Sequence, residues 1–182
     1  MVETNGRNFD LLTLGQVLLR LSPPDNERLS RGDTFVKQVG GAELNVAVGA
    51  ALLGLHTGVI SKLPAHDIGS FMKGKIRSFG VSDDFFMYDQ SPAARVGIYY
   101  YENGAYPRKP KVIYDRNNSS FFSLNIDEIP EEVYTASKCF HTTGITLALN
   151  EKIRETTIEM IKRFKAAGTL VSFDVNFRGN LW

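Results

Sequence analysis

The chain has 182 residues, of which 43% are hydrophobic and 23% are charged, the composition of one ordinary globular domain. The formal net charge of +1 gives no electrostatic case for binding nucleic acid or an anionic membrane surface. The longest uncharged apolar run, Val46 to Leu55, is much shorter than the roughly 20 residues of a membrane span. Cys139 is the only cysteine, which excludes an internal disulfide, and we expect a cytoplasmic protein.

The chain opens with a predicted lead-in and a buried strand. Residues 1–8 contain no apolar signal core and are predicted to be a loose segment. Residues 9–15 form an apolar run that ends in Gly15, which is typical of a buried parallel strand. Residues 16–21 continue this run with Arg20 in a polar position.

A glycine pair, Gly40-Gly41, precedes a predicted helix over residues 42–53. Glycine allows unusual backbone angles, and the free N–H groups of the first helical turn point back toward the turn. Asn45 lies on that first turn, where its amide can donate and accept hydrogen bonds. The stretch can hold an anion or a polyhydroxylated molecule, or it can be a tight turn before a buried helix.

An alternating pattern continues to residue 88. A strand over residues 56–63 is followed by a helix that Asp67 can cap and Gly80 ends, and then by an extended segment over residues 81–88. The alternation predicts an α/β sheet with right-handed crossovers.

The pattern then changes. Residues 95–102 and 111–116 are strand-like, and Asn103-Gly104 between them is a strong turn signal. We expect a hairpin or small sheet that stands off the main body.

The α/β alternation resumes in the last third of the chain. A short helix near residues 130–136 precedes a strand over 138–144. Asn150 is predicted to cap the clearest helix, whose buried face contains Ile153, Thr157, Ile158, Ile161 and Phe164. Residues 169–177 form the last predicted strand, which no later helix of this sequence covers.

Ligands of an open parallel sheet bind beyond the carboxyl ends of its strands, and a consistent set of polar and glycine residues is predicted there. The set comprises Gly15, Gln16, Gly40, Gly41, Asn45, Gly144, Asp174, Asn176 and Arg178, and the hairpin adds Tyr99, Tyr114 and Arg116.

Two residue types in this set indicate a ligand. Arg116 and Arg178 have the geometry to bind a carboxylate through both its oxygens, or they are solvated side chains at strand edges. Tyr99 and Tyr114 suit a sugar-like ligand, or they pack within the hairpin. His141 can face the same cleft or be a structural histidine. No catalytic set can be assembled from these residues.

The residues together resemble the N-terminal signature of the ribokinase-like (PfkB-type) carbohydrate kinases, and within that family the 2-keto-3-deoxygluconate kinases. The resemblance is carried by Gly40-Gly41-Ala42-Glu43-Leu44-Asn45-Val46-Ala47, Gly97-Ile98-Tyr99, Tyr114-Asp115-Arg116, Gly144-Ile145-Thr146 and Asp174-Val175-Asn176-Phe177-Arg178. It implies an α/β fold with an open, mostly parallel sheet, flanking helices and a small β lid. Residues 1–182 would be the N-terminal part, with lid segments at about 17–39 and 93–118.

The resemblance also implies an activity, the transfer of a phosphoryl group from ATP, with Mg²⁺, to a hydroxyl of 2-keto-3-deoxygluconate or a related sugar acid. By position, it assigns the sugar hydroxyls to Gly40, Gly41 and Asn45. It places Tyr99, Tyr114, Arg116, Ile145 and Arg178 in the same pocket, with the arginines on the carboxylate. The subfamily usually has Glu after the first-strand glycine, whereas Gln16 stands here and removes a charge.

The family's second signature, which carries the catalytic Asp, is not in this sequence, so we expect the C-terminal half to be absent and assign no catalytic residue or metal ligand. The leading hypothesis is the sugar-binding half of a kinase, inactive alone. The alternatives are a non-catalytic sugar-acid-binding module and a structural half that needs a second chain. The resemblance further implies a homodimer through residues 95–116 of the lid.

Overall fold

The computed structural model describes residues 6–182. The predicted loose lead-in therefore lies mostly outside the described residues, but the prediction is wrong for Arg7. The Arg7 guanidinium donates hydrogen bonds to the backbone oxygens of Ser137 at 3.0 Å and Ala167 at 2.7 Å. These bonds tie the segment before the first strand to Ser137 and Ala167, which are distant in sequence.

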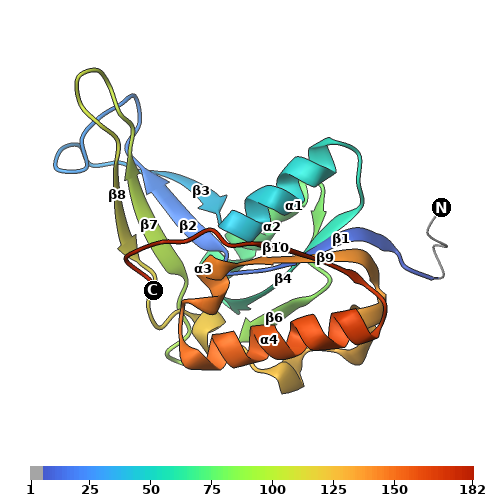
Figure 1. Cartoon of the computed structure of the whole chain (residues 1–182). Coiled ribbons are helices and arrows are strands. Elements are labelled where there is room, and N and C mark those ends of the chain that lie inside the picture. Colours follow the sequence, from blue (N-terminus) through green and yellow to red (C-terminus); the bar gives the residue numbers. More distant parts are fainter. Residues whose placement is uncertain (1–5) are drawn as a thin grey trace.

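Six parallel strands form the main sheet, in the order β10-β9-β1-β4-β5, and β6 also pairs with β4 (Figure 1). The strands are β1 (Phe9–Leu14), β4 (Thr57–Pro64), β5 (Val81–Ser82), β6 (Phe86–Asp89), β9 (Ser137–Thr143) and β10 (Leu170–Asp174). The predicted open parallel sheet is confirmed. Because the strands are parallel, their carboxyl ends meet at one edge of the sheet, next to the start of α1.

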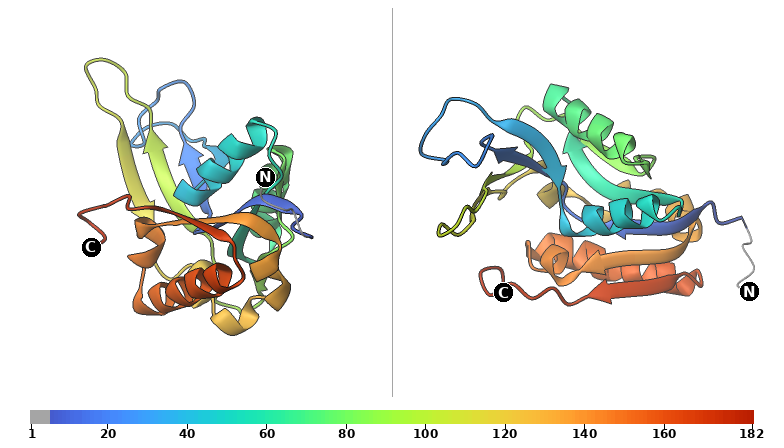
Figure 2. Two further views of the ribbon diagram at one scale, coloured as in Figure 1. Left: turned by 45° about the vertical axis from the view of Figure 1, so that its right-hand side comes forward. Right: turned by 90° about the horizontal axis from the view of Figure 1, so that it is seen from above.

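Helices cover both faces of the main sheet (Figure 2). One face carries α1 (Ala42–Leu52) and α2 (Asp67–Ser78), and the other carries α4 (Glu151–Ala166) and three 3₁₀ turns (Ser120–Ser123, Ile126–Glu128, Glu131–Thr135). The four-residue α3 (Gly144–Leu147) follows β9. No helix in residues 6–182 is long and apolar enough to cross a bilayer.

Two of the predicted helix ends can be compared directly with the structure. Asn150 caps α4 as predicted, since its side-chain oxygen accepts a hydrogen bond from the Ile153 N–H at 2.7 Å. Asp67 does not cap α2. The cap is His66, whose Nδ1 accepts from the Gly69 N–H at 3.4 Å. On α4, Ile158 is exposed, so its predicted place on the buried face was wrong.

Two predicted strands are interrupted or shortened by local turns. The extended segment over 81–88 breaks into β5 and β6 because the Phe86 N–H bonds to the Asp83 carbonyl at 3.1 Å. The last strand stops at Asp174, whose side chain accepts from the Asn176 N–H at 2.9 Å. Asn176 has a positive φ of 37°, which a strand does not allow.

A second sheet, the β lid, stands off the main body (Figure 1). Its strands are β2 (Leu18–Ser22), β3 (Val36–Gly40), β7 (Gly97–Glu102) and β8 (Lys111–Asp115), in the order β3-β2-β7-β8. The antiparallel pair β7–β8 confirms the predicted hairpin. Its connection spans residues 103–110 rather than the two-residue turn expected at Asn103-Gly104.

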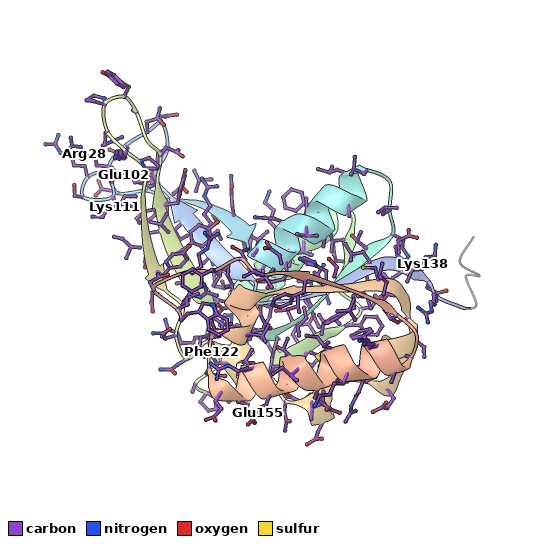
Figure 3. The ribbon with its side chains drawn as sticks, viewed as in Figure 1. Arg28, Glu102, Lys111, Phe122, Lys138 and Glu155 are labelled. Carbon is purple, nitrogen blue, oxygen red and sulfur yellow. The ribbon has the colours of Figure 1, made fainter. Side chains whose placement is uncertain are left out.

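A buried carboxylate at the outer end of the lid explains this longer connection. Glu102 accepts a hydrogen bond from the Leu29 N–H at 2.8 Å and pairs with Arg108 at 3.4 Å. It therefore joins the loop after β7 to the loop between β2 and β3. Figure 3 shows Arg28, Glu102 and Lys111 together at this end of the lid.

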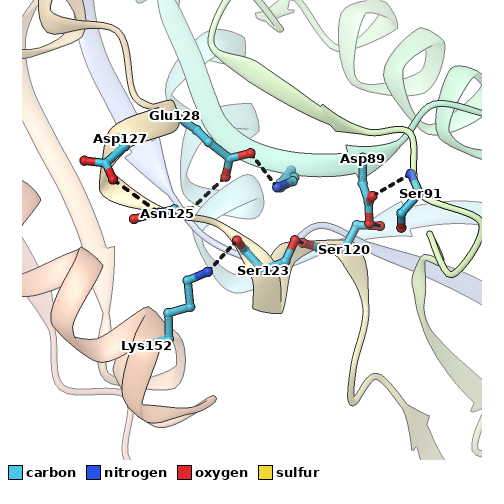
Figure 4. Close-up of polar contacts among 9 residues, drawn as sticks. Asp89, Ser91, Ser120, Ser123, Asn125, Asp127, Glu128 and Lys152 are labelled. Carbon is cyan, nitrogen blue, oxygen red and sulfur yellow. Dashed lines mark hydrogen bonds and ion pairs between the residues drawn. The ribbon is translucent and has the colours of Figure 1, made fainter.

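A polar network fixes the base of the lid to the main body (Figure 4). The Ser120 hydroxyl donates to Asp89 at 2.8 Å and accepts from the Arg95 N–H at 3.2 Å, just before β7 begins. The buried Lys62 of β4 pairs with Glu128 at 2.6 Å. The entry to β7 is thus held by β6 and by the 3₁₀ segment.

The ring pair Phe140–Phe164 allows a test of the core between the sheet and α4. The rings stack with centroids 4.1 Å apart, and both residues are fully buried. We expect Phe164→Ala to lower the free energy of unfolding by about 3–5 kcal/mol, measured by urea denaturation. Phe173→Ala, at an exposed phenylalanine of β10, is the matched control and should change it by less than about 1 kcal/mol. Equal losses in the two variants would contradict this account of the core.

Asp10 on β1 allows a pH test. Its carboxylate accepts from Lys138 at 2.7 Å and from the His56 N–H at 2.8 Å, and these bonds, the Lys138 bond first, hold its pKa below the ordinary value of 3.8. A lowered folded pKa adds stability above the unfolded pKa, and this stability is lost as the pH falls through the folded pKa. We therefore expect Asp10→Asn to be less stable than the wild type at pH 7, with the difference shrinking below about pH 4 in thermal melts. A difference independent of pH would show that the charge of Asp10 is not its cause.

Candidate functional site

A cavity of about 340 Å³ opens where the carboxyl edge of the main sheet meets the β lid and the first turn of α1. Its size is within the usual range for small-molecule sites. It is lined by Gln16, Leu18, Arg20, Gly41, Ala42, Glu43, Asn45, Tyr99, Tyr101, Val112, Tyr114, Arg116, Ile145 and Arg178.

Glu43, on the first turn of α1, forms the floor of this pocket and is only 2% exposed. Its Oε1 accepts hydrogen bonds from the hydroxyls of Thr143 and Thr146, both at 2.7 Å. A Cβ on Gly15 would collide with the Glu43 carboxylate, so the glycine that follows β1 makes room for it. The carboxylate therefore joins α1 to β9 and α3, next to the end of β1.

The glycine pair before α1 forms one side of the pocket. Gly41 has a φ of +155°, and a Cβ there would lie 2.8 Å from the Gln16 carbonyl oxygen. A Cβ on Gly40 would collide with the Tyr99 hydroxyl. The pair thus lets the lid come close to the start of α1, where the side chain of Asn45 is exposed to the pocket.

Tyrosine and arginine side chains on one face of the lid form the opposite wall. Tyr99 of β7 and Tyr114 of β8 are cross-strand partners with ring centroids 5.9 Å apart. Arg20 of β2 lies over the Tyr101 ring, 4.4 Å from its centroid. Burial raises the pKa of Tyr99, so its hydroxyl keeps its proton at neutral pH and can donate to a ligand.

Arg116 follows β8 and is held by Gln16. The Arg116 Nε–H donates to the Gln16 side-chain oxygen at 2.8 Å. Burial lowers the pKa of Arg116, against the opposing effects of Tyr114 and Glu43, and an arginine so placed remains charged at neutral pH.

A second cavity of about 500 Å³ continues from the first toward the end of the chain. It shares Val112, Tyr114, Arg116, Ile145 and Arg178 with the first cavity and adds Asp115, Asn117, Asn180 and Leu181. Figure 1 shows the segment after β10 running toward the base of β8. Arg178 thereby comes to the same space as Arg116.

Positive charge predominates around the pocket. Its lining contains Arg20, Arg116 and Arg178, but Glu43 is its only acidic residue. Among the described residues, none of these arginines forms an ion pair with a carboxylate within 4.0 Å. Such an arrangement favours an anion that has other polar groups.

Most of the residues predicted from the sequence for substrate binding come together here. Gly41, Asn45, Tyr99, Tyr114, Arg116, Ile145 and Arg178 line the cavity, and Gly40 lies directly behind Tyr99. Of the remaining strand-end residues, Gln16 lines the pocket, whereas Asp174, Asn176 and Gly144 do not.

His141 does not line the pocket either. It is buried on β9, where its Nδ1 lies 2.9 Å from the Ser172 hydroxyl, as expected of a structural histidine.

Sequence reasoning did not assign three polar residues of the pocket, Arg20, Glu43 and Tyr101, to the site. Glu43 lies inside the glycine-helix signature, but its partners Thr143 and Thr146 are a hundred residues away and no spacing rule connects them. Arg20 and Tyr101 could have been found from the alternation of side chains along the lid strands. Tyr101 is two residues after Tyr99 on β7 and Arg20 is the cross-strand partner of Tyr99, so all three side chains lie on the same face of the lid.

The fit to magnesium can be tested on the side chains present. Within residues 6–182, no three or more His, Cys, Asp or Glu side chains gather in a group that could hold a metal ion. We therefore assign no residue of this chain to magnesium.

Comparison with known proteins adds an independent observation. The model of the pfkB family carbohydrate kinases matches residues 8–182. The chain belongs to the pfkB family. The resemblance inferred from the signature residues is thus confirmed.

Individual relatives of this pfkB chain agree on the kind of enzyme. It is 39% identical to a 2-dehydro-3-deoxygalactonokinase of Haloferax volcanii, over 95% of this chain and 54% of the relative. It is 30% identical to a 2-dehydro-3-deoxygluconokinase of Bacillus subtilis, over 96% of this chain and 53% of the relative. The crystal structure of a 2-dehydro-3-deoxygluconokinase from Thermotoga maritima superposes with a TM-score of 0.89 at 35% identity, over 96% of this chain and 53% of that one. The chain therefore spans about half the length of the relatives it matches.

The Glu43 floor can be tested by substitution. Glu43→Ala removes the acceptor of two buried hydroxyls, and we expect a loss of about 2–4 kcal/mol in the free energy of unfolding, measured in urea. Glu43→Gln keeps an oxygen acceptor and the side-chain volume, so its loss should be clearly smaller. If the two variants were equally stable, the hydrogen bonds to Thr143 and Thr146 would not be what holds the pocket floor.

Proposed function

We propose that this chain binds a sugar acid in the arginine-lined pocket, as the sugar-binding part of an ATP-dependent kinase. The substrate class is 2-keto-3-deoxygluconate or a related sugar acid, and the product is its phosphate ester. A cytoplasmic location is part of the same proposal. The observation that carries it is the set of three pocket arginines without an acidic partner within 4.0 Å.

The pocket offers separate groups for the two ends of such a ligand. Arg116 and Arg178 lie where both cavities meet, and two guanidinium groups are suited to a carboxylate. At the opposite side, the first turn of α1 offers the Asn45 amide, and the lid offers the Tyr99 hydroxyl. These uncharged groups suit sugar hydroxyls. We assign Gly40 and Gly41 to the close approach of the sugar, and Ile145 to its apolar face.

ATP would supply the phosphoryl group. Phosphoryl transfer needs residues that neutralise charge on the phosphates and position the acceptor hydroxyl. The proposal gives this chain the second task only, and it routes no catalytic step through the residues described. The names of the relatives support a kinase as the whole, since the two aligned relatives above are named as kinases of dehydro-deoxy sugar acids.

Calorimetry with 2-keto-3-deoxygluconate tests the binding step. We expect the 182-residue chain to bind it, and Arg116→Ala to weaken binding by about 10- to 100-fold through loss of a charge-assisted hydrogen-bond pair. Arg154→Ala is the charge-matched control, because Arg154 lies on α4 outside the pocket and its side chain bonds, among the described residues, to the Leu147 carbonyl alone. Binding that is absent in the wild type, or equal in Arg116→Ala, would refute the proposal.

A turnover assay separates the remaining alternatives. We expect no ATP-dependent phosphorylation of the sugar acid by these 182 residues alone. Binding without turnover agrees with either a kinase half or a non-catalytic binding module. Addition of the C-terminal half of a relative separates these two, because turnover should be restored for a kinase half and should stay absent for a binding module. Turnover by the chain itself would show that it contains a catalytic residue that we have not assigned.

The same proposal includes a homodimer through the β lid. All five residues of β8 are exposed, its outer edge is unpaired among the described strands, and Ile113 is 44% exposed. An exposed apolar edge strand favours association.

Light scattering tests the dimer. We expect a dimer for the wild type and a monomer for Ile113→Asp, which places a charge on the lid. Leu170→Asp, on the exposed edge strand β10 of the main sheet, is the control and should leave the dimer intact. A monomer of the wild type at high concentration, or loss of the dimer only in Leu170→Asp, would refute the lid interface.

A further inference from the structure

Arg20 lines the pocket, but the proposed function gives it no part of the ligand. We propose that Arg20 forms a second anion subsite at the outer end of the pocket, which binds the far carboxylate of a dicarboxylic sugar acid. The subsite rests on the proposed function, because the first carboxylate of such a ligand lies at Arg116 and Arg178.

Neighbouring side chains direct the Arg20 guanidinium away from the base of the lid. Its Nε–H donates to the Ser22 hydroxyl at 2.9 Å, two residues farther along β2. Its Cζ lies 4.4 Å from the centroid of the Tyr101 ring. A guanidinium that stacks on a ring and bonds through Nε still has its terminal N–H groups for a planar anion. Arg20 is therefore held in one direction without using the groups that recognise a carboxylate.

Arg116 directs its guanidinium to the opposite end of the tyrosine wall. Its Nε–H donates to the Gln16 side-chain oxygen at the base of the lid, and its Cζ lies 5.6 Å from the centroid of the Tyr114 ring. Tyr99 stands between the two arginines, because its strand β7 pairs with β2 on one side and with β8 on the other. The pocket thus has a guanidinium at each end and tyrosine rings between them.

The strand register gives the length between the two ends. A Cβ on Gly97, the first residue of β7, would lie 3.4 Å from the Arg116 Cα, whereas the Arg20 guanidinium lies over Tyr101 on the same strand. From Gly97 to Tyr101 a strand rises about 13 Å. The end carbons of an extended six-carbon chain are about 6 Å apart. A hydrogen bond at each end adds about 3 Å. A six-carbon dicarboxylate therefore spans the two ends, and a four-carbon one falls short.

The charge of the lining agrees with a ligand of two negative charges. Three arginines line the pocket, and the one acidic residue beside them is Glu43. A monocarboxylate leaves one of these positive charges unbalanced, whereas a dicarboxylate balances them all. The charge of Arg20 acts inside the pocket, because it is the largest influence opposing the burial that raises the pKa of Tyr99.

Calorimetry with two six-carbon acids tests the subsite, because D-gluconate and D-glucarate differ only at carbon 6. We expect the 182-residue chain to bind glucarate about tenfold or more tighter than gluconate at neutral pH. In Arg20→Gln this preference should fall to within about twofold, since the far carboxylate loses its charged partner. Gluconate binding should change by less than about threefold, because gluconate places its carboxylate at Arg116 and Arg178. No preference in the wild type, or an unchanged preference in Arg20→Gln, would overturn the proposal.

Three controls separate a built subsite from general charge or a folding defect. Arg28→Gln removes an exposed arginine at the outer end of the lid, outside the pocket, and should keep the preference (Figure 3). Arg20→Lys keeps the charge but not the planar fork, so its preference should lie between those of the wild type and Arg20→Gln. Tartrate, with four carbons, should bind equally to the wild type and to Arg20→Gln.

Two outcomes of these controls would also overturn the subsite. Equal losses of gluconate and glucarate in an Arg20→Gln chain that circular dichroism shows to be folded would mean that Arg20 only supports the lid. A loss of tartrate as large as that of glucarate would mean that Arg20 acts through its charge alone, without a fixed distance to Arg116.

The subsite and the proposed function fail in distinguishable ways. If the wild type binds 2-keto-3-deoxygluconate but does not favour glucarate over gluconate, the proposed function stands and the subsite fails. If it favours glucarate through Arg20 but does not bind 2-keto-3-deoxygluconate, the subsite stands and the proposed substrate fails. Binding of none of these acids overturns both.

Discussion

The buried carboxylate of Glu43 is the constraint on which the pocket depends. A carboxylate removed from water is costly unless it is hydrogen-bonded, and here the donors to its Oε1 are Thr143 at the end of β9 and Thr146 in α3. Gly15 makes room for it at the end of β1. For these contacts to form, the carboxyl ends of the neighbouring strands β1 and β9 must lie at a fixed distance from the start of α1. The helix N-terminus is therefore held against the sheet edge, and the pocket floor is rigid.

The two threonines also separate this negative charge from the arginines around it. Glu43 lies in a pocket lined by Arg20, Arg116 and Arg178, yet its Oε1 accepts from the two threonines and it forms no ion pair within 4.0 Å among the described residues. Glu43 is near enough to raise the pKa of Arg116, but burial has the larger effect and the pKa is lowered overall. The pocket thus keeps a net positive lining above an acidic floor. That combination suits an anion at the arginines without making the whole site strongly basic.

Much of the fold could be predicted from the sequence, because local signals determine it. Asn150 and the apolar spacing after it predict α4 correctly, and the glycine pair correctly predicts that α1 starts at Ala42. The predictions failed where a tertiary contact overrides a local signal. Asn103-Gly104 predicts a tight turn, but Glu102 draws residues 103–110 into a longer connection through Arg108. Glu43 and Gln16 were left without a role for the same reason, since their partners are distant in sequence and only the folded chain brings them together.

The site lies on the seam between two sheets, and this determines which residues can reach the same ligand. Arg116 follows β8 of the lid, whereas Arg178 follows β10 of the main sheet, and both reach the same cavities. Two guanidinium groups that share a cavity repel each other when no anion lies between them. The proposed carboxylate would replace that repulsion with two attractions, one to each sheet. The lid is attached at its base by Gln16 and Ser120, which contact Arg116 and Asp89 respectively. These bonds fix the base of the lid beside the main sheet, so the two arginines that would hold the proposed carboxylate are kept at one cavity although they come from different sheets.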